Sequence, residues 1–410
     1  MTKITTINLS NNSLDDEAPS ISGNKVGWSQ WQSTNYDAMY HNGTKIIDLG
    51  YSSVFSDQDI DVSGTKVVWV SKGLMGQSDI YQYDGSNTIN LSGDYTDILY
   101  NSQPQVSGNN VVWVSDEEIY LFNGTQAINL SNNNLEDVDP RISGGKVAWS
   151  GWDGNNWEIY FYNGTKTIKL TNNSKTDDLP QISGNKVVWN RWDGNDWEIY
   201  FYNGTKTIQL TNNNYNDEYP SISGNNVVWS RFDGQDTEIY FYNGSKTTKL
   251  TNDNYNDATP KISDNKIAWW SWDGNDGEIY CYDGSSVIQV TNNNYEDTNL
   301  DFSGNKIVWQ GWDGNDWEIY KATLSQTTSL SANDVITNFN NTPENERLLA
   351  TKSVELINND VGESLFTSGA RTPTFAAIND SISGDNPLIH AIGEATYFTE
   401  SLEQHSSSLI

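Results

Sequence analysis

The sequence predicts an all-β protein: an eight-bladed β-propeller closed by an N-terminal strand, followed by a small β-rich C-terminal domain. A Ser-Gly turn (once Ser-Asp) recurs eight times along the 410 residues, and a Trp follows each turn five residues later. The steps between the serines are 41, 44, 36 and then 40 four times, which is the length of a four-stranded propeller blade. The serines are Ser22, Ser63, Ser107, Ser143, Ser183, Ser223, Ser263 and Ser303.

Residues 180–219 show how one repeat divides into four strands. "PQIS" is a short apolar strand before the turn "GN", and "KVVWNRW" is rich in β-branched and aromatic residues. The turn "DGND" separates it from "WEIYFY", and the hairpin signal "NGT" leads into "KTIQLT". A polar stretch, "NNNYNDEY", then connects to the next repeat. No segment has a convincing helical period, which excludes helical solenoids.

The two ends of the repeat region predict a closed ring. "KITTINLS" at residues 3–10 matches a fourth strand such as "TKTIKLTN" at residues 165–172, and the eighth repeat loses the pattern after "WEIYKATL". We therefore expect the N-terminal strand to complete the last blade, with "TTSL" at residues 327–330 as its competitor. Because all 17 Trp lie between Trp28 and Trp317, we place the propeller at residues 1–322 and a separate domain at residues 323–410.

The composition narrows the classes of partner. Asp and Glu number 54 against 23 Lys and Arg, so the net charge of -31 disfavours nucleic acid and anionic membranes. No stretch approaches 18 apolar residues, so no membrane insertion is expected. The first 20 residues lack an apolar h-region, so we expect no N-terminal signal peptide of the usual kind. The single cysteine, Cys281, excludes an internal disulfide.

The strand order of a propeller predicts that function resides on one face. The loops between second and third strands, such as "WDGNDW", share a face with the connections between blades, such as "TNNNYNDEYP". The opposite face carries short turns and lysines. Loops on a rigid scaffold are the usual place for binding residues.

Two kinds of site are predicted on this acidic, aromatic face. Hard cations take carboxylate oxygens, so calcium is the one cofactor that the sequence suggests, although Asp, Gly and Asn are also ordinary turn residues. The candidate metal ligands are Asp193, Asp196 and Glu198 and their counterparts Asp313, Asp316 and Glu318. Aromatic rings stack on sugars, although the same rings also pack between blades. The candidate ligand-binding residues are Trp152, Trp157, Trp192, Trp197, Trp272, Trp312 and Trp317, with Tyr215, Tyr255 and Tyr295.

Catalytic motifs are absent from the sequence. The three histidines are not in metal-binding spacing, and no G-x-S-x-G elbow occurs. Near-identical repeats also disfavour a single specialised pocket. We therefore expect no enzyme, and the alternative is a carbohydrate-active enzyme that uses carboxylates of the central channel.

Two family resemblances extend these expectations. The pattern P-x-I-S-G-N-K-V-V-W, DGND-x-E-I-Y, NG and I-x-L-T resembles the repeats of TolB-like propellers over residues 3–322, which implies the fold and leaves the function open. In the tail, "DVITNFN", "RLLATKS" and "TFAAINDSISG" resemble the bluetail domain of cyanobacterial surface and RTX-type exported proteins. That likeness implies an extracellular or cell-surface protein with a C-terminal export signal. The alternative is an accessory domain without a sorting role.

The function expected from these observations is a non-enzymatic binding scaffold. We expect a monomer that engages a glycan, peptide or protein ligand through its acidic aromatic face. A second alternative is a cytoplasmic hub for protein interactions.

Overall fold

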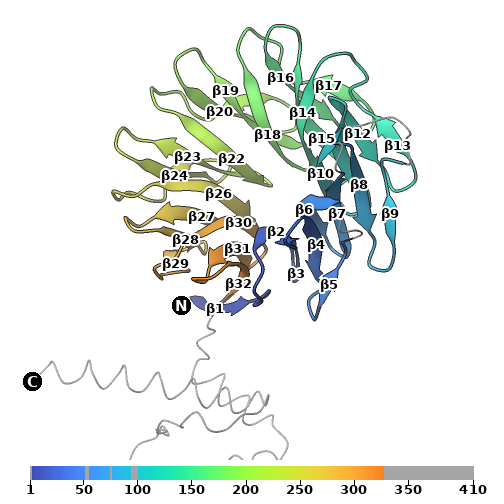
Figure 1. Ribbon diagram of the computed structural model, residues 1–410. Coiled ribbons are helices and arrows are strands. Elements are labelled where there is room, and N and C mark those ends of the chain that lie inside the picture. Colours follow the sequence, from blue (N-terminus) through green and yellow to red (C-terminus); the bar gives the residue numbers. More distant parts are fainter. Residues whose placement is uncertain (1, 51–54, 74–75, 94–99, 327–410) are drawn as a thin grey trace, which may run out of the picture. The chain divides into compact units, whose positions relative to one another are not determined.

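Eight four-stranded antiparallel sheets form the propeller in the computed structural model, which describes residues 2–50, 55–73, 76–93 and 100–326 (Figure 1). We number the blades 1 to 8 in the order of their first strands. The eight-bladed, all-β architecture expected from the repeat is confirmed. No helix occurs among the described residues, and so none of them forms a helix long and apolar enough to cross a membrane. Residues 327–410, with the competing "TTSL" and the bluetail-like tail, lie outside the described residues.

The strands have the following bounds. The first strands are β2 (Asp16–Ser22), β6 (Ser56–Ser63), β10 (Asn101–Ser107), β14 (Asp137–Ser143), β18 (Asp177–Ser183), β22 (Asp217–Ser223), β26 (Asp257–Ser263) and β30 (Asp297–Ser303). The second strands are β3 (Lys25–Trp31), β7 (Lys66–Lys72), β11 (Asn110–Ser115), β15 (Lys146–Trp152), β19 (Lys186–Trp192), β23 (Asn226–Phe232), β27 (Lys266–Trp272) and β31 (Lys306–Trp312). The third strands are β4 (Tyr36–His41), β8 (Ser78–Tyr83), β12 (Glu118–Phe122), β16 (Trp157–Tyr162), β20 (Trp197–Tyr202), β24 (Thr237–Tyr242), β28 (Gly277–Tyr282) and β32 (Trp317–Gln326). The fourth strands are β5 (Ile46–Asp48), β9 (Thr88–Asn90), β13 (Ala127–Asn129), β17 (Thr167–Lys169), β21 (Thr207–Gln209), β25 (Thr247–Lys249), β29 (Val287–Gln289) and β1 (Thr2–Asn8).

The N-terminal strand closes the ring as the sequence predicts. β1 pairs antiparallel with β32 and is the fourth strand of blade 8, with Ile4 opposite Leu324 in the register. β32 continues past residue 322 to Gln326, because its last residues pair with β1. This pairing covers an edge that would otherwise offer unpaired backbone groups to other chains.

The recurring serines join each blade to the next. The hydroxyl oxygen of Ser183 in blade 5 accepts the backbone N–H of Gly224 in blade 6 at 2.9 Å. Ser303 in blade 8 accepts the N–H of Gly23 in blade 1 at 3.0 Å, so the series of bonds runs around the complete ring. The same contact occurs at all eight joints. The Ser-Gly turn is thus also an inter-blade contact, which the repeat pattern alone does not show.

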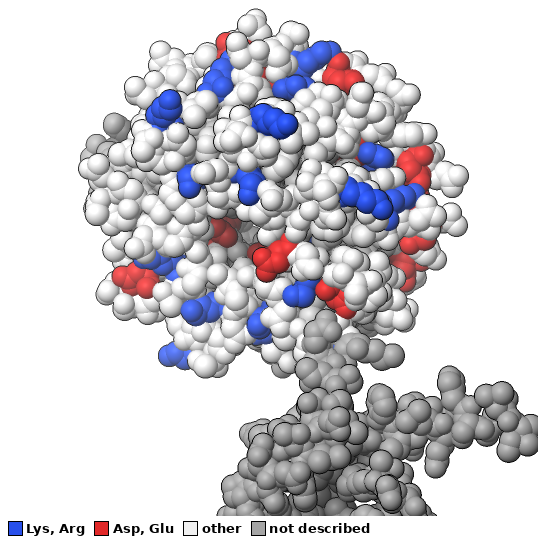
Figure 2. All heavy atoms as spheres, turned by 180° about the vertical axis from the view of Figure 1, so that it is seen from behind, with Lys and Arg blue, Asp and Glu red and all other residues white. Residues whose placement is uncertain are grey.

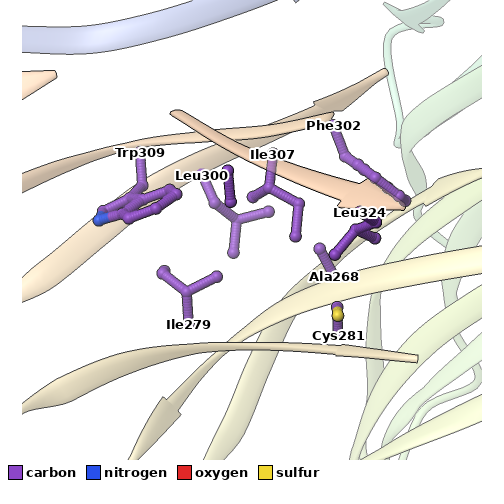
Figure 3. Close-up of a cluster of buried hydrophobic side chains, with 9 residues drawn as sticks. Ala268, Ile279, Cys281, Leu300, Phe302, Ile307, Trp309 and Leu324 are labelled. Atoms are coloured by element: carbon purple, nitrogen blue, oxygen red, sulfur yellow. The ribbon is translucent and has the colours of Figure 1, made fainter. Parts of the chain in front are cut away.

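The core lies between neighbouring blades. Each mid-strand Trp is almost fully buried, and seven of them stack on a Tyr of the third strand, as Trp189 does on Tyr200 with ring centroids 6.1 Å apart. Figure 3 shows the cluster between blades 7 and 8, where Cys281 and Ala268 face Phe302 and Leu324. The burial of large aromatic and β-branched side chains on both faces of each sheet is the main stabilising contribution to the ring.

Candidate functional site

The strand order separates two faces of the ring. Second strands such as β19 begin with a lysine at one end and reach the "DGND" turn at the other. We call the face with these turns and the blade-to-blade connections the DGND face. Figure 2 shows a face over which Lys and Arg side chains are spread, with acidic side chains beside the central hollow and at the rim. This division agrees with the expectation of one basic face and one acidic, aromatic face.

The first aspartate of each DGND turn is a turn cap. Oδ1 of Asp193 accepts the backbone N–H groups of Asn195 at 2.8 Å and of Asp196 at 3.3 Å. These backbone hydrogen bonds lower the pKa of Asp193. Gly194 has a φ of +110°, which favours glycine at this position. The turn interpretation therefore accounts for Asp193, and the same bonds recur at Asp313.

The second aspartate of the turn points inward to a glutamate of the third strand. Asp196 and Glu198 are buried, and carboxylate oxygens of Asp193, Asp196 and Glu198 lie within 4.8 Å of one another. Burial, followed by the charge of Asp193, raises the pKa of Asp196, and burial also raises that of Glu198. Three further clusters of this form occur in the described chain: Asp233, Asp236 and Glu238; Asp273, Asp276 and Glu278; and Asp313, Asp316 and Glu318.

The tryptophans that bracket each DGND turn pack against each other. Trp192 and Trp197 are opposite in the register of β19 and β20, with an edge-to-face contact at 5.7 Å between ring centroids. The same edge-to-face contact occurs between Trp152 and Trp157 and between Trp312 and Trp317. Of the seven candidate tryptophans, Trp192 and Trp272 are exposed, at 36% and 37%, and the other five are partly buried. The packing interpretation therefore holds for the paired rings, and ligand binding by these tryptophans stays a prediction.

The three candidate tyrosines are exposed and lie against the turn of the following blade. The ring of Tyr215 lies over Gly234, where a Cβ would come within 3.5 Å of it, and Tyr255 lies in the same way over Gly274. Tyr295 takes this position over Gly314. With Phe232, which replaces Trp192 in blade 6, they form an arc of exposed aromatic rings across blades 5 to 8. We call this set the aromatic arc: Trp192, Tyr215, Phe232, Tyr255, Trp272 and Tyr295.

Blade 7 departs from the pattern, and a neighbouring residue compensates. Gly277 stands where blade 5 has Trp197, and a Cβ on it would meet Nε1 of Trp270 at 2.1 Å. The indole of Trp270 thus occupies the space of the missing tryptophan and donates its N–H to Glu296 at 3.2 Å. In the sequence, the one sign that Trp270 takes the place of a tryptophan at position 277 is that it directly follows Trp269.

Carboxylates of the central channel are engaged by neighbouring blades. Asp61 accepts hydrogen bonds from the Ser20 hydroxyl at 3.0 Å and from the Val106 N–H at 2.7 Å, so it joins three blades. Asp301 accepts the N–H of Ile21 at 2.9 Å across the joint between blades 8 and 1. Burial raises the pKa of Asp61 to about 6. These contacts give both groups a structural role in joining neighbouring blades.

Comparisons with known proteins concern the fold. No protein-family model matches the chain, and no curated protein matches it. It is similar to the β-propeller domain of the Trilobed protease from Pyrococcus furiosus, with 11% identity and a TM-score of 0.50, over 68% of this chain and 99% of that one. It is similar to the computationally designed Ika8 protein, with 16% identity and a TM-score of 0.53, over 76% and 98% of the two chains.

A third similar structure is longer than this chain. For Pyrococcus horikoshii acylaminoacyl peptidase, with 11% identity and a TM-score of 0.48, the match covers 73% of this chain and only 59% of that one. The likeness to TolB-like repeats and to the bluetail domain stays a prediction. What the ring geometry and the solved structures support together is a β-propeller fold, which in this chain has eight blades.

Proposed function

We propose that this protein is a non-enzymatic binding scaffold that takes an extended glycan on the aromatic arc of its DGND face. The observation that carries the proposal is the repetition of exposed rings at equivalent positions, such as Tyr215, Tyr255 and Tyr295 at 44%, 43% and 46% exposure. Exposed apolar patches on the loops of a rigid scaffold are typical of interaction surfaces.

The chemistry of the arc favours a neutral glycan over other ligands. Tyr and Trp rings present apolar faces that fit the C–H faces of sugars, and the flanking Asp and Asn side chains are hydrogen-bonding partners for hydroxyl groups. The strongly acidic chain repels anionic polymers. Equivalent rings in successive blades also suit a ligand built of repeating units.

A non-catalytic role is supported by the channel, where Asp61 and Asp301 already accept hydrogen bonds from neighbouring blades. The extracellular or cell-surface location implied by the tail belongs to the same proposal. Cell fractionation tests that part, and recovery of the protein only in the cytosol contradicts it.

A neutral-glycan array, followed by calorimetry on the best oligosaccharide, tests the binding proposal. We expect Trp192→Ala and Tyr255→Ala each to weaken binding about tenfold or more, which corresponds to ~1.4 kcal/mol. Ile89→Ala and Val287→Ala are matched controls, because these residues are similarly exposed but lie on fourth strands. Their affinity should not change.

Three other outcomes would count against the proposal. Binding of a peptide or protein instead of any glycan supports the interaction-hub alternative. Release of reducing ends from the oligosaccharide supports the alternative enzyme that uses channel carboxylates. A loss of affinity in the fourth-strand controls equal to that in Trp192→Ala would place the ligand elsewhere.

A further inference from the structure

The second aspartate of the DGND turn lacks a partner in blade 5. Asp196 is only 4% exposed, and neither of its carboxylate oxygens has a hydrogen-bonding partner among the described residues. Beside it, Glu198 is fully buried. Oδ2 of Asp276, Oε2 of Glu278 and Oδ2 of Asp316 are buried without a partner in the same way. Buried carboxylates that face each other cost free energy unless a positive charge or a donor lies between them.

Blade 4 shows what this position requires, because Asn156 stands there in place of Asp196. Its Nδ2 donates to the backbone carbonyl oxygens of Lys175 at 2.8 Å and Asn173 at 3.3 Å, and to Oε1 of Glu158 at 3.3 Å. Asn35 in blade 1 does the same with Oδ1 of Asp37 and the carbonyl of Phe55, both at 3.0 Å. The position is thus surrounded by oxygen acceptors, and an aspartate adds a further acceptor where a donor is needed.

Blade 6 shows that a cation fits the cluster. The ammonium group of Lys249 lies 3.0 Å from Oδ2 of Asp233 and 3.1 Å from Oε1 of Glu238, and it donates to Oδ1 of Asn252 at 2.7 Å. In blade 4, Lys169 approaches Asp153 at 2.9 Å and Glu158 at 3.8 Å. In these two blades the protein itself supplies the positive charge.

Blades 5, 7 and 8 have neutral residues at the position of Lys249: Gln209, Gln289 and Asn8. In blade 5 the ammonium of Lys175 donates to the backbone carbonyl of Asp193. Tyr255 and Tyr295 take that place beside the turns of blades 7 and 8. Among the described residues, ion pairs with an ammonium therefore occur in the clusters of blades 4 and 6 but not in those of blades 5, 7 and 8. In blade 6 both oxygens of Glu238 also lack a hydrogen-bond donor, and the ion pair with Lys249 supplies the compensating charge.

We propose that blades 5, 7 and 8 each bind one Ca²⁺ ion at this cluster, in the place that a lysine ammonium takes in blade 6. The three sites are Asp193, Asp196 and Glu198; Asp273, Asp276 and Glu278; and Asp313, Asp316 and Glu318.

The donor set fits Ca²⁺, which takes six to eight oxygen ligands in flexible geometry. Carboxylates supply part of the shell. By the repeat, the carbonyl groups equivalent to those of Asn173 and Lys175 supply another part, and in blade 5 these belong to Asn213 and Tyr215. No His or Cys belongs to any of the clusters, so they do not favour softer transition metals. The inference holds whether or not a glycan binds to the aromatic arc.

Equilibrium dialysis of the chelator-treated full chain against Ca²⁺, with elemental analysis, tests the proposal. The triple variant Asp196→Asn, Asp276→Asn, Asp316→Asn should bind three fewer ions than the wild type, and each single variant one fewer. Asn35 and Asn156 show that the blade accepts asparagine at this position, so the variants should remain folded. Tb³⁺, a luminescent substitute for Ca²⁺, gives a second readout through excitation of the nearby tryptophans.

Lys249→Gln is the matched gain-of-site variant. Removal of the ammonium should open the cluster of Asp233, Asp236 and Glu238 and add one ion to the wild-type number. An equal number of bound ions in the wild type and the triple variant, at millimolar free Ca²⁺, would overturn the proposal. If Lys249→Gln binds the same number of ions as the wild type, the role given to the ammonium is overturned.

Discussion

Trp309 donates its indole N–H to Oδ1 of Asp297 at 2.7 Å, and both side chains are buried. The bond connects the second strand of blade 8 to the first strand, and Oδ2 of the same aspartate accepts the side-chain amide of Asn293 at 2.7 Å. The equivalent indole bond occurs in blades 1, 4, 5, 6 and 7. Blade 3 has Asn101 in place of the aspartate, and in blade 2 the indole N–H of Trp69 has no hydrogen-bonding partner among the described residues.

Trp309→Phe should therefore destabilise the protein more than Trp69→Phe. Both changes remove the same ring volume from a buried position, but only the first leaves a buried carboxylate oxygen without its donor. The difference should be about 1–3 kcal/mol in the free energy of unfolding. Urea unfolding of the two variants measures it, and equal losses would show that the bond contributes nothing net.

The buried aspartates predict a pH dependence of stability. Burial raises the pKa of Asp16, Asp57 and Asp137 to about 6, and that of Asp297 to about 7, from an ordinary value of 3.8. Between pH 4 and 7 the folded protein therefore binds more protons than the unfolded chain, so the free energy of unfolding falls as the pH rises. Turn caps such as Asp193, whose pKa is lowered, titrate below this window.

Urea unfolding at pH 4.5, 6.0 and 7.5 in the presence of a chelator measures this trend. Asp137→Asn should flatten the profile, by at most about 1.4 kcal/mol for each pKa unit of the shift it removes. Blade 3 already carries Asn101 at this position, which makes the substitution compatible with the fold. Stability that rises across the window would be inconsistent with protonated buried aspartates.

Deletion of residues 1–9 should open the ring. β32 would lose the partner that pairs with it from Tyr320 to Gln326, and the exposed edge would favour self-association. We expect a lower Tm and higher oligomers in size-exclusion chromatography, compared with the monomer expected for the full chain. An unchanged Tm in the deleted protein would instead indicate that residues 327–330 can take the place of β1.

Gly277→Trp should destabilise blade 7, because the indole of Trp270 already occupies the space of the new side chain. Combining it with Trp270→Asn restores the pair of residues found in blade 5, Asn190 and Trp197. The double-mutant cycle should give a favourable coupling of about 0.5–3 kcal/mol. Additive effects in thermal or urea unfolding would show that the two side chains do not compete for one space.

The number of blades, their strands and the closing strand were predictable, because they depend on local and periodic signals. The step of 40 residues, the Asn-Gly hairpins and the match between residues 3–10 and a fourth strand needed no knowledge of neighbours in space. The candidate site was only partly predictable. A turn Asp that caps its own turn and one that points at a buried Glu look alike in the sequence. In blade 5, Asp193 is of the first kind and Asp196 is of the second.

By itself, then, the sequence determined the eight-bladed ring, its closure and the face that carries the acidic and aromatic loops. Only the tertiary structure decided that Trp192 packs edge-on against Trp197 while keeping one side exposed, and that Lys249 places its ammonium among the carboxylates of blade 6. The physical reason is that strand and turn propensities act within a few residues along the chain. Burial, charge compensation and ring exposure depend instead on side chains that meet across strands and blades.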